Sequence, residues 1–182
     1  ASPDGARVSE LLDEHVRRGV RFNACSLHQL AEFGRVAPGR EVAVRINPGL
    51  GSGSTNRTNT GGPASSFGIW HEHLDEVQAI AERCGLRIHR LHSHVGSGTD
   101  PEVWKRCARL TLDLAGQFPE VSSVNLGGGF KVGRMPEEPS VDLADVGAHV
   151  RSEIEVFRER DGRALHREIE PGTYLVALAG AV

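Results

Sequence analysis

The sequence predicts an α/β fold built from parallel βα units. Short apolar runs alternate along the chain with longer segments whose apolar residues recur at helical spacing. Unusual glycine- and histidine-rich sequences follow directly after several of these apolar runs. The chain has 182 residues, enough for one domain with a hydrophobic core, and we expect 1–182 to form a single domain.

Five strands and about five helices are expected, in alternation. The strands are predicted at 21–24, 42–46, 86–95, 121–126 and 165–169, and the helices at 9–18, 26–34, 71–84, 100–118 and 141–160. Ser26 and Gln29 spell a capping box, and Asp100 precedes a proline at a helix start. Gly34 and Gly85 are expected to end their helices. The helix after Asp100 is expected to bury a stripe of Val103, Cys107, Leu110, Leu114 and Phe118.

Composition and charge argue against nucleic-acid binding, membrane insertion and secretion. A formal net charge of -3 provides no basic face for nucleic acid or anionic lipid. No apolar run approaches the roughly 20 residues of a membrane span, and the first residues lack a secretory signal pattern. The three cysteines are widely spaced, so we expect reduced thiols in a cytoplasmic protein.

Candidate functional residues follow the predicted strands, where parallel strands of a barrel or a doubly wound sheet carry their sites. The alternation fits either architecture, although a whole barrel usually takes about 250 residues. His92 and His94 share one face of a strand and precede the glycines of 96–98. They fit a flat cofactor, a metal site or a hydrogen-bonded structural pair, and these residues alone do not choose among the three.

Three other strand ends carry candidates. Gly127, Gly128 and Gly129 leave bare amides that suit an anion, although a tight turn accounts for them equally well. Glu168 and Glu170 share a strand face, where a carboxylate needs a cation or a donor such as a pyridinium nitrogen. A salt bridge to an arginine, for example Arg167, is the structural alternative. Arg45 lies within an apolar strand and is expected to point into the barrel, or else to lie at the surface, and a long polar loop follows it at 49–62.

Taken together, these segments resemble the alanine-racemase-like, group IV family of pyridoxal-phosphate decarboxylases, most of all the diaminopimelate decarboxylases. The order and spacing of the segments make the resemblance specific, and they span nearly the whole chain. The matching stretches are Phe-Asn-Ala-Cys-Ser at 22–26, Arg-Ile-Asn-Pro at 45–48, Thr-Gly-Gly at 60–62, Ser-Phe-Gly-Ile at 66–69, the histidine segment at 91–97, Leu-Gly-Gly-Gly-Phe at 126–130 and Glu-Pro-Gly at 170–172.

The resemblance implies a role for each matched position. His94 would stack on the ring of pyridoxal 5'-phosphate, and Glu170 would pair with its pyridine nitrogen. Ser97, Gly128 and Gly129 would bind the phosphate, with Gly127 shaping the turn, and Arg45 would lie under the cofactor near its phenolic oxygen. It implies decarboxylation of meso-diaminopimelate to lysine, with another basic amino acid or carboxynorspermidine as alternative substrates, and no metal.

The chain also departs from this family. The Tyr-x-x-Lys-x-Asn stretch that holds the cofactor covalently is missing, and the only lysines are Lys105 and Lys131. The Cys-Glu-Ser-x-Asp segment is absent, Thr173 stands where Arg is usual, and Ser66 stands where Lys is common. We therefore expect strands four to eight of a (β/α)8 barrel, without the first barrel strands and the C-terminal β-domain.

Such a half-barrel is expected to be inactive alone and to form a homodimer or pair with the missing half. A noncatalytic binding or regulatory module that pairs with a complete barrel subunit is the alternative from another class.

Overall fold

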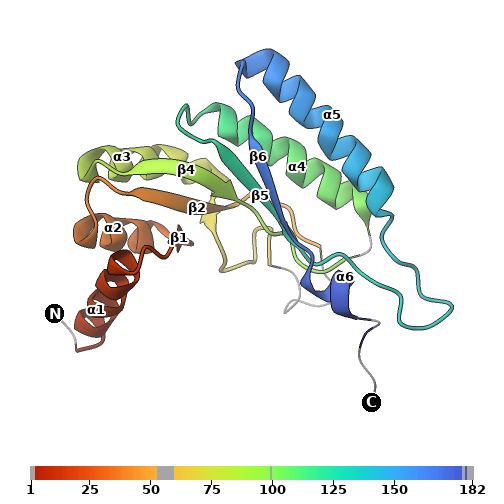
Figure 1. Cartoon of the computed structure of the whole chain (residues 1–182), viewed down its shortest axis with the longest axis horizontal. Coiled ribbons are helices and arrows are strands. Elements are labelled where there is room, and N and C mark those ends of the chain that lie inside the picture. Colours follow the sequence, from red (N-terminus) through yellow and green to blue (C-terminus); the bar gives the residue numbers. More distant parts are fainter. Residues whose placement is uncertain (1–2, 53–59, 99, 178, 180–182) are drawn as a thin grey trace.

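The computed structural model of the chain describes residues 3–52, 60–98, 100–177 and 179. Helices and strands alternate through these residues as the sequence predicts (Figure 1). The strands are β1 (Asn23–Ala24), β2 (Glu41–Asn47), β3 (Ile69–Trp70), β4 (Arg87–His92), β5 (Ser123–Gly128) and β6 (His166–Glu170). The helices are α1 (Pro3–Arg17), α2 (Leu27–Val36), α3 (Leu74–Cys84), α4 (Pro101–Gly116), α5 (Leu143–Asp161) and α6 (Gly172–Val176), with a 3-10 turn at His71–His73.

The order of the strands decides between the two architectures that the sequence left open. The sheet runs β1-β2-β4-β5-β6, every pairing is parallel, and the short β3 pairs only with the end of β2. Each βα unit therefore adds its strand on the same side of the previous one, with no reversal of the kind that defines a doubly wound sheet. This sequential parallel order is that of a (β/α)8 barrel, so the chain forms part of such a barrel.

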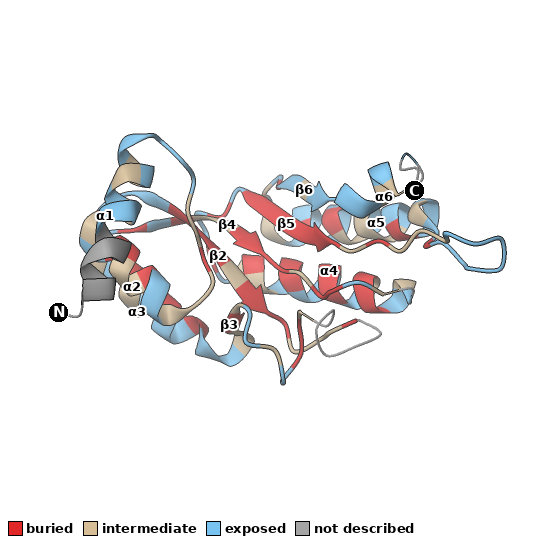
Figure 2. Cartoon of the chain, turned by 90° about the horizontal axis from the view of Figure 1, so that it is seen from below, coloured by how far each residue is buried: buried red, intermediate tan, exposed pale blue. Residues whose placement is uncertain are grey.

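The two faces of the sheet differ in chemistry. Side chains on the outer face are apolar and pack into the main core with α2, α3, α4 and α5; they include Val42, Val44, Ile46, Leu91 and Val124. The inner face carries a set of polar side chains: Arg45, Arg90, His92, Ser123, Asn125, Glu168 and Glu170. β2, β4 and β5 are largely buried, whereas most of β6 is exposed (Figure 2).

The helix caps follow the sequence signals. Gln29 N donates to Ser26 Oγ at 3.1 Å, and Gln29 Oε1 accepts from Cys25 N at 2.7 Å. Asp100 Oδ1 accepts from Glu102 N at 2.9 Å, and Gly85 caps α3 with a φ of 63°. These local signals predict helix ends because each one satisfies backbone groups within a few residues.

Three predictions about helices are wrong. α1 begins at Pro3, six residues before the predicted start at residue 9. α2 continues past Gly34 to Val36, because Gly34 serves helix packing: a Cβ there would lie 2.6 Å from Cys84 Sγ of α3. In the stripe predicted for α4, Val103, Cys107 and Phe118 are buried as expected, but Leu110 is 38% exposed. The buried face of α4 is wider than predicted and also includes Trp104, Ala108 and Leu112. β3 and α6 were not predicted, and 53–59 of the long polar loop lie outside the described residues.

Within the described residues, none of the helices has the length and apolar character that crossing a membrane requires.

Candidate functional site

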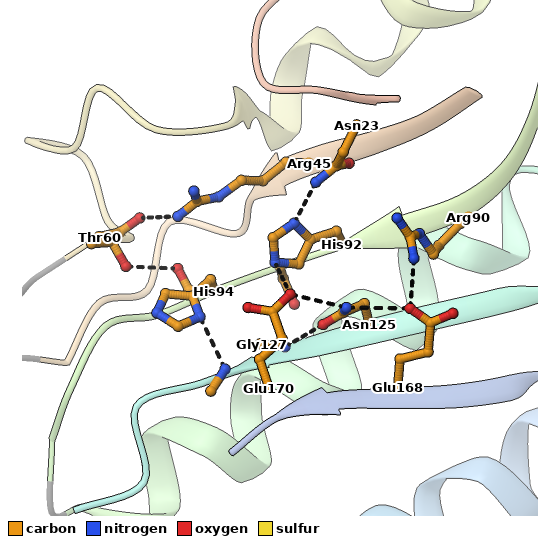
Figure 3. Close-up of polar contacts among 12 residues, drawn as sticks. Asn23, Arg45, Thr60, Arg90, His92, His94, Asn125, Gly127, Glu168 and Glu170 are labelled. Atoms are coloured by element: carbon orange, nitrogen blue, oxygen red, sulfur yellow. Dashed lines mark hydrogen bonds and ion pairs between the residues drawn. The ribbon is translucent and has the colours of Figure 1, made fainter. Parts of the chain in front are cut away.

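Parallel strand register gathers the polar inner-face residues into one row. Arg45 pairs in register with His92, His92 with Asn125, and Asn125 with Glu168. Four neighbouring strands thus each present one polar side chain at the same height, near their carboxyl ends (Figure 3). In a barrel, this end of the strands carries the active site.

His92 lies at the centre of the row and is 7% exposed. Its Nδ1 lies 2.7 Å from Asn23 Nδ2, and its Nε2 lies 3.7 Å from Glu170 Oε1. Burial, helped by the charge of Arg45 and by His94, lowers the pKa of His92 to about 3. The imidazole is therefore neutral near pH 7, with Nδ1 as the acceptor for the Asn23 amide.

His94 follows β4, and both its ring and its backbone carbonyl accept hydrogen bonds. The amide of Gly128 donates to His94 Nδ1 at 3.0 Å, and Thr60 Oγ1 donates to the His94 carbonyl at 3.4 Å. Burial and then the charge of Arg45 lower the pKa of His94, although Glu170 opposes the shift. The result is a neutral ring with Nδ1 as acceptor and Nε2 carrying the proton.

The glycine turn after β5 fits against the segment that carries His94. Gly127 has a φ of 73°, and a Cβ there would lie 2.5 Å from His94 Nδ1. At Gly128 a Cβ would lie 1.8 Å from the Glu170 carbonyl oxygen, and at Gly129 2.2 Å from the Gly96 carbonyl oxygen. Any side chain here would collide with its neighbours, so the triplet allows three segments to approach each other.

The expectation of bare amides along this triplet is wrong for two of its members. Gly127 N donates to Asn125 Oδ1 at 2.8 Å, and Gly128 N donates to His94. These two amides orient side chains of the inner face, because the turn brings their N–H groups back toward β4 and β5. Gly128 is consequently a residue that positions His94 in this structure.

Asn125 joins the two carboxylates of β6. Its Nδ2 lies 3.3 Å from Glu168 Oε2 and 3.1 Å from Glu170 Oε1. Glu168 also binds Arg90 at 2.6 Å, so its cation comes from a strand of the inner face rather than from the predicted neighbour Arg167. Burial alone would raise the pKa of Glu168, but Arg90 and the donors around it hold that pKa below its ordinary value.

Arg45 is half-buried, as expected for a residue that points into the barrel. Its Nη2 donates to the Thr60 carbonyl at 3.2 Å, and its guanidinium lies 5.1 Å from the centre of the Phe67 ring. The loop after β2 therefore folds back over the arginine and holds its charge near the two histidines.

A cavity of about 380 Å³ adjoins the glycine turn. Ser97 and Gly129 line it together with Lys131, Arg134 and Thr173. One carboxylate, that of Glu138, also lines the cavity, so the two basic side chains leave its charge positive. Together with the glycine turn, the serine and the threonine, this arrangement suits a small anion.

The structure brings the predicted residues into one region of the molecule. Gly127 and Gly128 both lie against other site residues, Gly127 against His94 and Gly128 against His94 and Glu170. Ser97 and Gly129 line the adjoining cavity, and Arg45 acts on both histidines through its charge. The sequence reasoning missed Asn125 and Asn23 as site residues. An asparagine inside an otherwise apolar strand was the signal that could have found Asn125.

His92, His94 and Glu170 also offer ligand atoms that all lie within 4.8 Å of one another. The geometry alone thus admits a metal ion as well as an organic cofactor.

Comparison with known proteins distinguishes these interpretations. Sequential parallel βα units with a polar row toward the carboxyl ends of the strands define part of a (β/α)8 barrel with its site at that end. The family described as pyridoxal-dependent decarboxylase, pyridoxal binding domain, matches residues 4–177, and the chain belongs to this family. Diaminopimelate decarboxylase of Streptomyces coelicolor is 38% identical over 171 residues, which cover 92% of this chain and 38% of that protein.

Solved structures agree with this assignment. A crystal structure of a diaminopimelate decarboxylase superposes with a TM-score of 0.79 at 31% identity, covering 96% of this chain and 40% of that one. The Helicobacter pylori diaminopimelate decarboxylase, complexed with L-lysine, has the same fold, with a TM-score of 0.73, 20% identity, and coverage of 90% and 42%. The chain therefore spans about two fifths of the length of these relatives.

Proposed function

We propose that the chain forms the ring- and phosphate-binding part of a pyridoxal-phosphate-dependent decarboxylase that converts meso-diaminopimelate to lysine. The observation that carries the proposal is the meeting of His94, Gly128 and Glu170 beside a basic cavity. An aromatic ring with a phosphate at one end needs this combination of a flat neutral face, a carboxylate and an anion site.

The ring would lie against His94, with Glu170 opposite the pyridine nitrogen. A neutral imidazole suits this contact, since a charged one would repel a protonated pyridine ring, and both burial and Arg45 lower the pKa of His94 and keep it neutral. Asn125 holds Glu170 in place through the 3.1 Å hydrogen bond. Arg45, near both histidines, would face the phenolic oxygen of the ring.

The phosphate would occupy the cavity lined by Ser97 and Gly129. Lys131 and Arg134 supply the positive charge there, which matters because Thr173 replaces the arginine common in the family. Gly127 and Gly128 would not bind the phosphate directly, because their amides donate to Asn125 and His94 and orient those side chains.

The bound cofactor would supply an electron-withdrawing ring that stabilises negative charge as carbon dioxide leaves the substrate. This chain's own residues would orient the ring, hold Glu170 opposite the pyridine nitrogen through Asn125 and keep His94 unprotonated. They do not supply the covalent anchor: Lys105 is bound to Glu102 at 2.9 Å and Asp145 at 2.7 Å, and Lys131 lies on the phosphate side. Cofactor binding to this chain would therefore be noncovalent, and the chain alone would not turn over substrate.

The substrate and the assembly belong to the same proposal. The named relatives are diaminopimelate decarboxylases, which favours that substrate over other basic amino acids and carboxynorspermidine. The chain spans about two fifths of the length of these relatives, and the rest of such a barrel would complete the site. Because the outer strand β6 is largely exposed, we expect it to pair with a missing barrel half or a second copy in a cytoplasmic homodimer.

Binding of pyridoxal phosphate, compared with pyridoxal and inorganic phosphate, tests the proposal. The chain should bind pyridoxal phosphate saturably by equilibrium dialysis and gain thermal stability from it. The Lys131→Gln variant should bind pyridoxal phosphate several-fold more weakly and leave pyridoxal binding unchanged, because only the phosphate meets Lys131. Lys105→Gln is the matched control, as its ammonium serves Glu102 and Asp145.

Failure of the unmodified chain to bind pyridoxal phosphate would contradict the proposal. Reduction with borohydride should leave no adduct on either lysine, and a trapped adduct on Lys131 would overturn the noncovalent part. Association with a full-length diaminopimelate decarboxylase, without any binding of pyridoxal phosphate, would favour the noncatalytic module instead.

A metal-dependent hydrolase is the second candidate, because three possible ligands cluster at His92, His94 and Glu170. Elemental analysis of the purified chain decides this point. Stoichiometric zinc that pyridoxal phosphate fails to displace would favour the metal.

A further inference from the structure

One carboxylate oxygen of Glu170 carries the hydrogen bond that holds this side chain. Its Oε1 accepts from Asn125 Nδ2 at 3.1 Å, whereas Oε2 makes no hydrogen bond or ion pair in the part of the chain that the structure describes. The Glu170 side chain is 50% exposed, so packing alone does not fix its rotamer. A second donor on Oε1 would be needed to keep Oε2 directed at one partner.

His92 presents such a donor to the same oxygen (Figure 3). Its Nε2 lies 3.7 Å from Glu170 Oε1, which is too long for a hydrogen bond. This nitrogen is buried from water and has no hydrogen-bond partner among the described residues. A buried N–H without an acceptor costs free energy, so a small rotation of the half-exposed Glu170 side chain toward His92 would be favourable.

Further hydrogen bonds orient both donors. Asn125 Oδ1 accepts from the Gly127 amide at 2.8 Å, and because a backbone N–H can only donate, the side-chain NH2 of Asn125 must face the carboxylates. Asn23 Nδ2 lies 2.7 Å from His92 Nδ1 and donates to it, which places the proton of the neutral ring on Nε2. The other tautomer would turn the lone pair of Nε2 toward a carboxylate oxygen, and the two would repel each other.

The strand order explains how these side chains meet. Asn23 lies on β1, His92 on β4 and Glu170 on β6, so each contact passes over one strand of the order β1-β2-β4-β5-β6. In a (β/α)8 barrel, the inward side chains of alternate strands share one layer. The three residues are therefore members of one such layer, and His92 at its centre connects β1 with the carboxylate on β6.

We propose that His92 is a positioning residue for the contact between Glu170 and the pyridine nitrogen of the cofactor. Its Nε2–H and the Asn125 amide together hold Oε1, which leaves Oε2 to accept the N–H of the pyridinium ring. This role rests on the proposed function, because the nitrogen is that of pyridoxal phosphate.

Two probes isolate the contact at the nitrogen: pyridoxal phosphate, and deazapyridoxal phosphate, in which a C–H group replaces the pyridine nitrogen. Equilibrium dialysis with each probe gives a ratio of dissociation constants in which the phosphate contacts cancel. The parent should bind pyridoxal phosphate at least about tenfold more tightly than the analogue, since only the nitrogen can bond the carboxylate. A general loss of structure would weaken both probes together and leave this ratio unchanged.

Variants assign the ratio to His92. His92→Leu should lower it at least about fivefold, because Glu170 loses a donor. His92→Gln, whose amide can donate from near the position of Nε2, should keep most of it. His89→Leu, the same substitution three residues earlier on β4, is the matched control and should keep the parental ratio. In a Glu170→Gln background, His92→Leu should not change the ratio, because His92 acts through the carboxylate.

Nitrogen NMR of isotope-labelled histidines in the ligand-free chain tests the tautomer without a substitution at His92. The ring should carry its proton on Nε2, in a resonance that exchanges slowly with water and shifts in Glu170→Gln. A proton on Nδ1 would overturn the positioning role, even if His92→Leu does not fold.

Three binding results count against this role, and each has a different meaning. If the parent does not bind pyridoxal phosphate, the proposed function fails and the role of His92 fails with it. If the parent binds both probes equally, the chain still binds the phosphate, but the contact of Glu170 with the nitrogen is overturned. Equal ratios in the parent and in His92→Leu would overturn the positioning role alone.

Discussion

Acidification should destabilise the fold through His92. In the unfolded chain its imidazole has the ordinary pKa near 6.5, whereas burial, with Arg45 and His94, lowers the folded-state pKa to about 3. Between these two values the unfolded chain binds a proton that the folded chain does not. The free energy of unfolding therefore falls as the pH falls through this window, and the contribution is complete only above about pH 6.5.

The magnitude follows from the two pKa values. Each pH unit within the window changes the free energy of unfolding by about 1.4 kcal/mol per site. Lowering the pH from about 7.5 to about 5 crosses roughly 1.5 units of the window, so His92 alone should cost about 2 kcal/mol. That is a large part of the roughly 5–15 kcal/mol that stabilises a typical domain.

Urea unfolding followed by circular dichroism at the two pH values measures this loss. The His92→Gln variant should lose about 2 kcal/mol less than the parent between them, since glutamine does not titrate. His28→Gln, at an exposed position on α2, is the matched control and should lose as much as the parent. His89 and His94, whose pKa values are also lowered, contribute equally to all three proteins. An unchanged pH dependence in His92→Gln would refute the reasoning.

Three further predictions concern the packing that supports the site. Phe157→Ala should lower the free energy of unfolding by about 3–5 kcal/mol in urea titrations, because this ring is only 1% exposed; a loss below about 1 kcal/mol would contradict its place in the core. Ser26→Ala should cost about 1 kcal/mol by thermal unfolding and Ser26→Thr much less, since the hydroxyl caps α2; equal losses would argue against the cap. Arg90→Met and Glu168→Gln should couple by about 0.5–3 kcal/mol in a double-mutant cycle, and simple additivity would show that their 2.6 Å ion pair contributes nothing.

Local sequence signals predict where helices and strands lie, but not which helices and strands pack against each other. The caps at Ser26, Asp100 and Gly85 depend on atoms a few residues away, so they are legible in the sequence. Strand order depends on pairings between distant segments, and alternation alone could not separate a barrel from a doubly wound sheet. Gly34 was mistaken for a helix end because its reason is Cys84 on another helix, 50 positions along the chain.

For the candidate site, too, the sequence predicts some features and not others. The resemblance identified residues at strand ends, and parallel register then gathers several of them without further information. What the sequence could not predict is which hydrogen bonds those residues make with each other. An arginine partner was the structural alternative for the carboxylates of β6, with Arg167 as the example. Glu168 does bind an arginine, but it is Arg90 on β4, two strands away from β6 in the sheet.

The glycine turn at 127–129 packs directly against His94, and these contacts affect how a cofactor would be held. Gly127 and Gly128 are excluded from carrying side chains by contacts with His94, Ser93 and Glu170, and their amides are already used within the chain. These glycines fix the imidazole and Asn125 before any ligand arrives, which lowers the entropic cost of forming the ring site. The anion site is left to Ser97, Gly129 and the basic residues beside them. A chain without the anchoring lysine would then owe most of its affinity for pyridoxal phosphate to the phosphate, and pyridoxal alone should bind far more weakly.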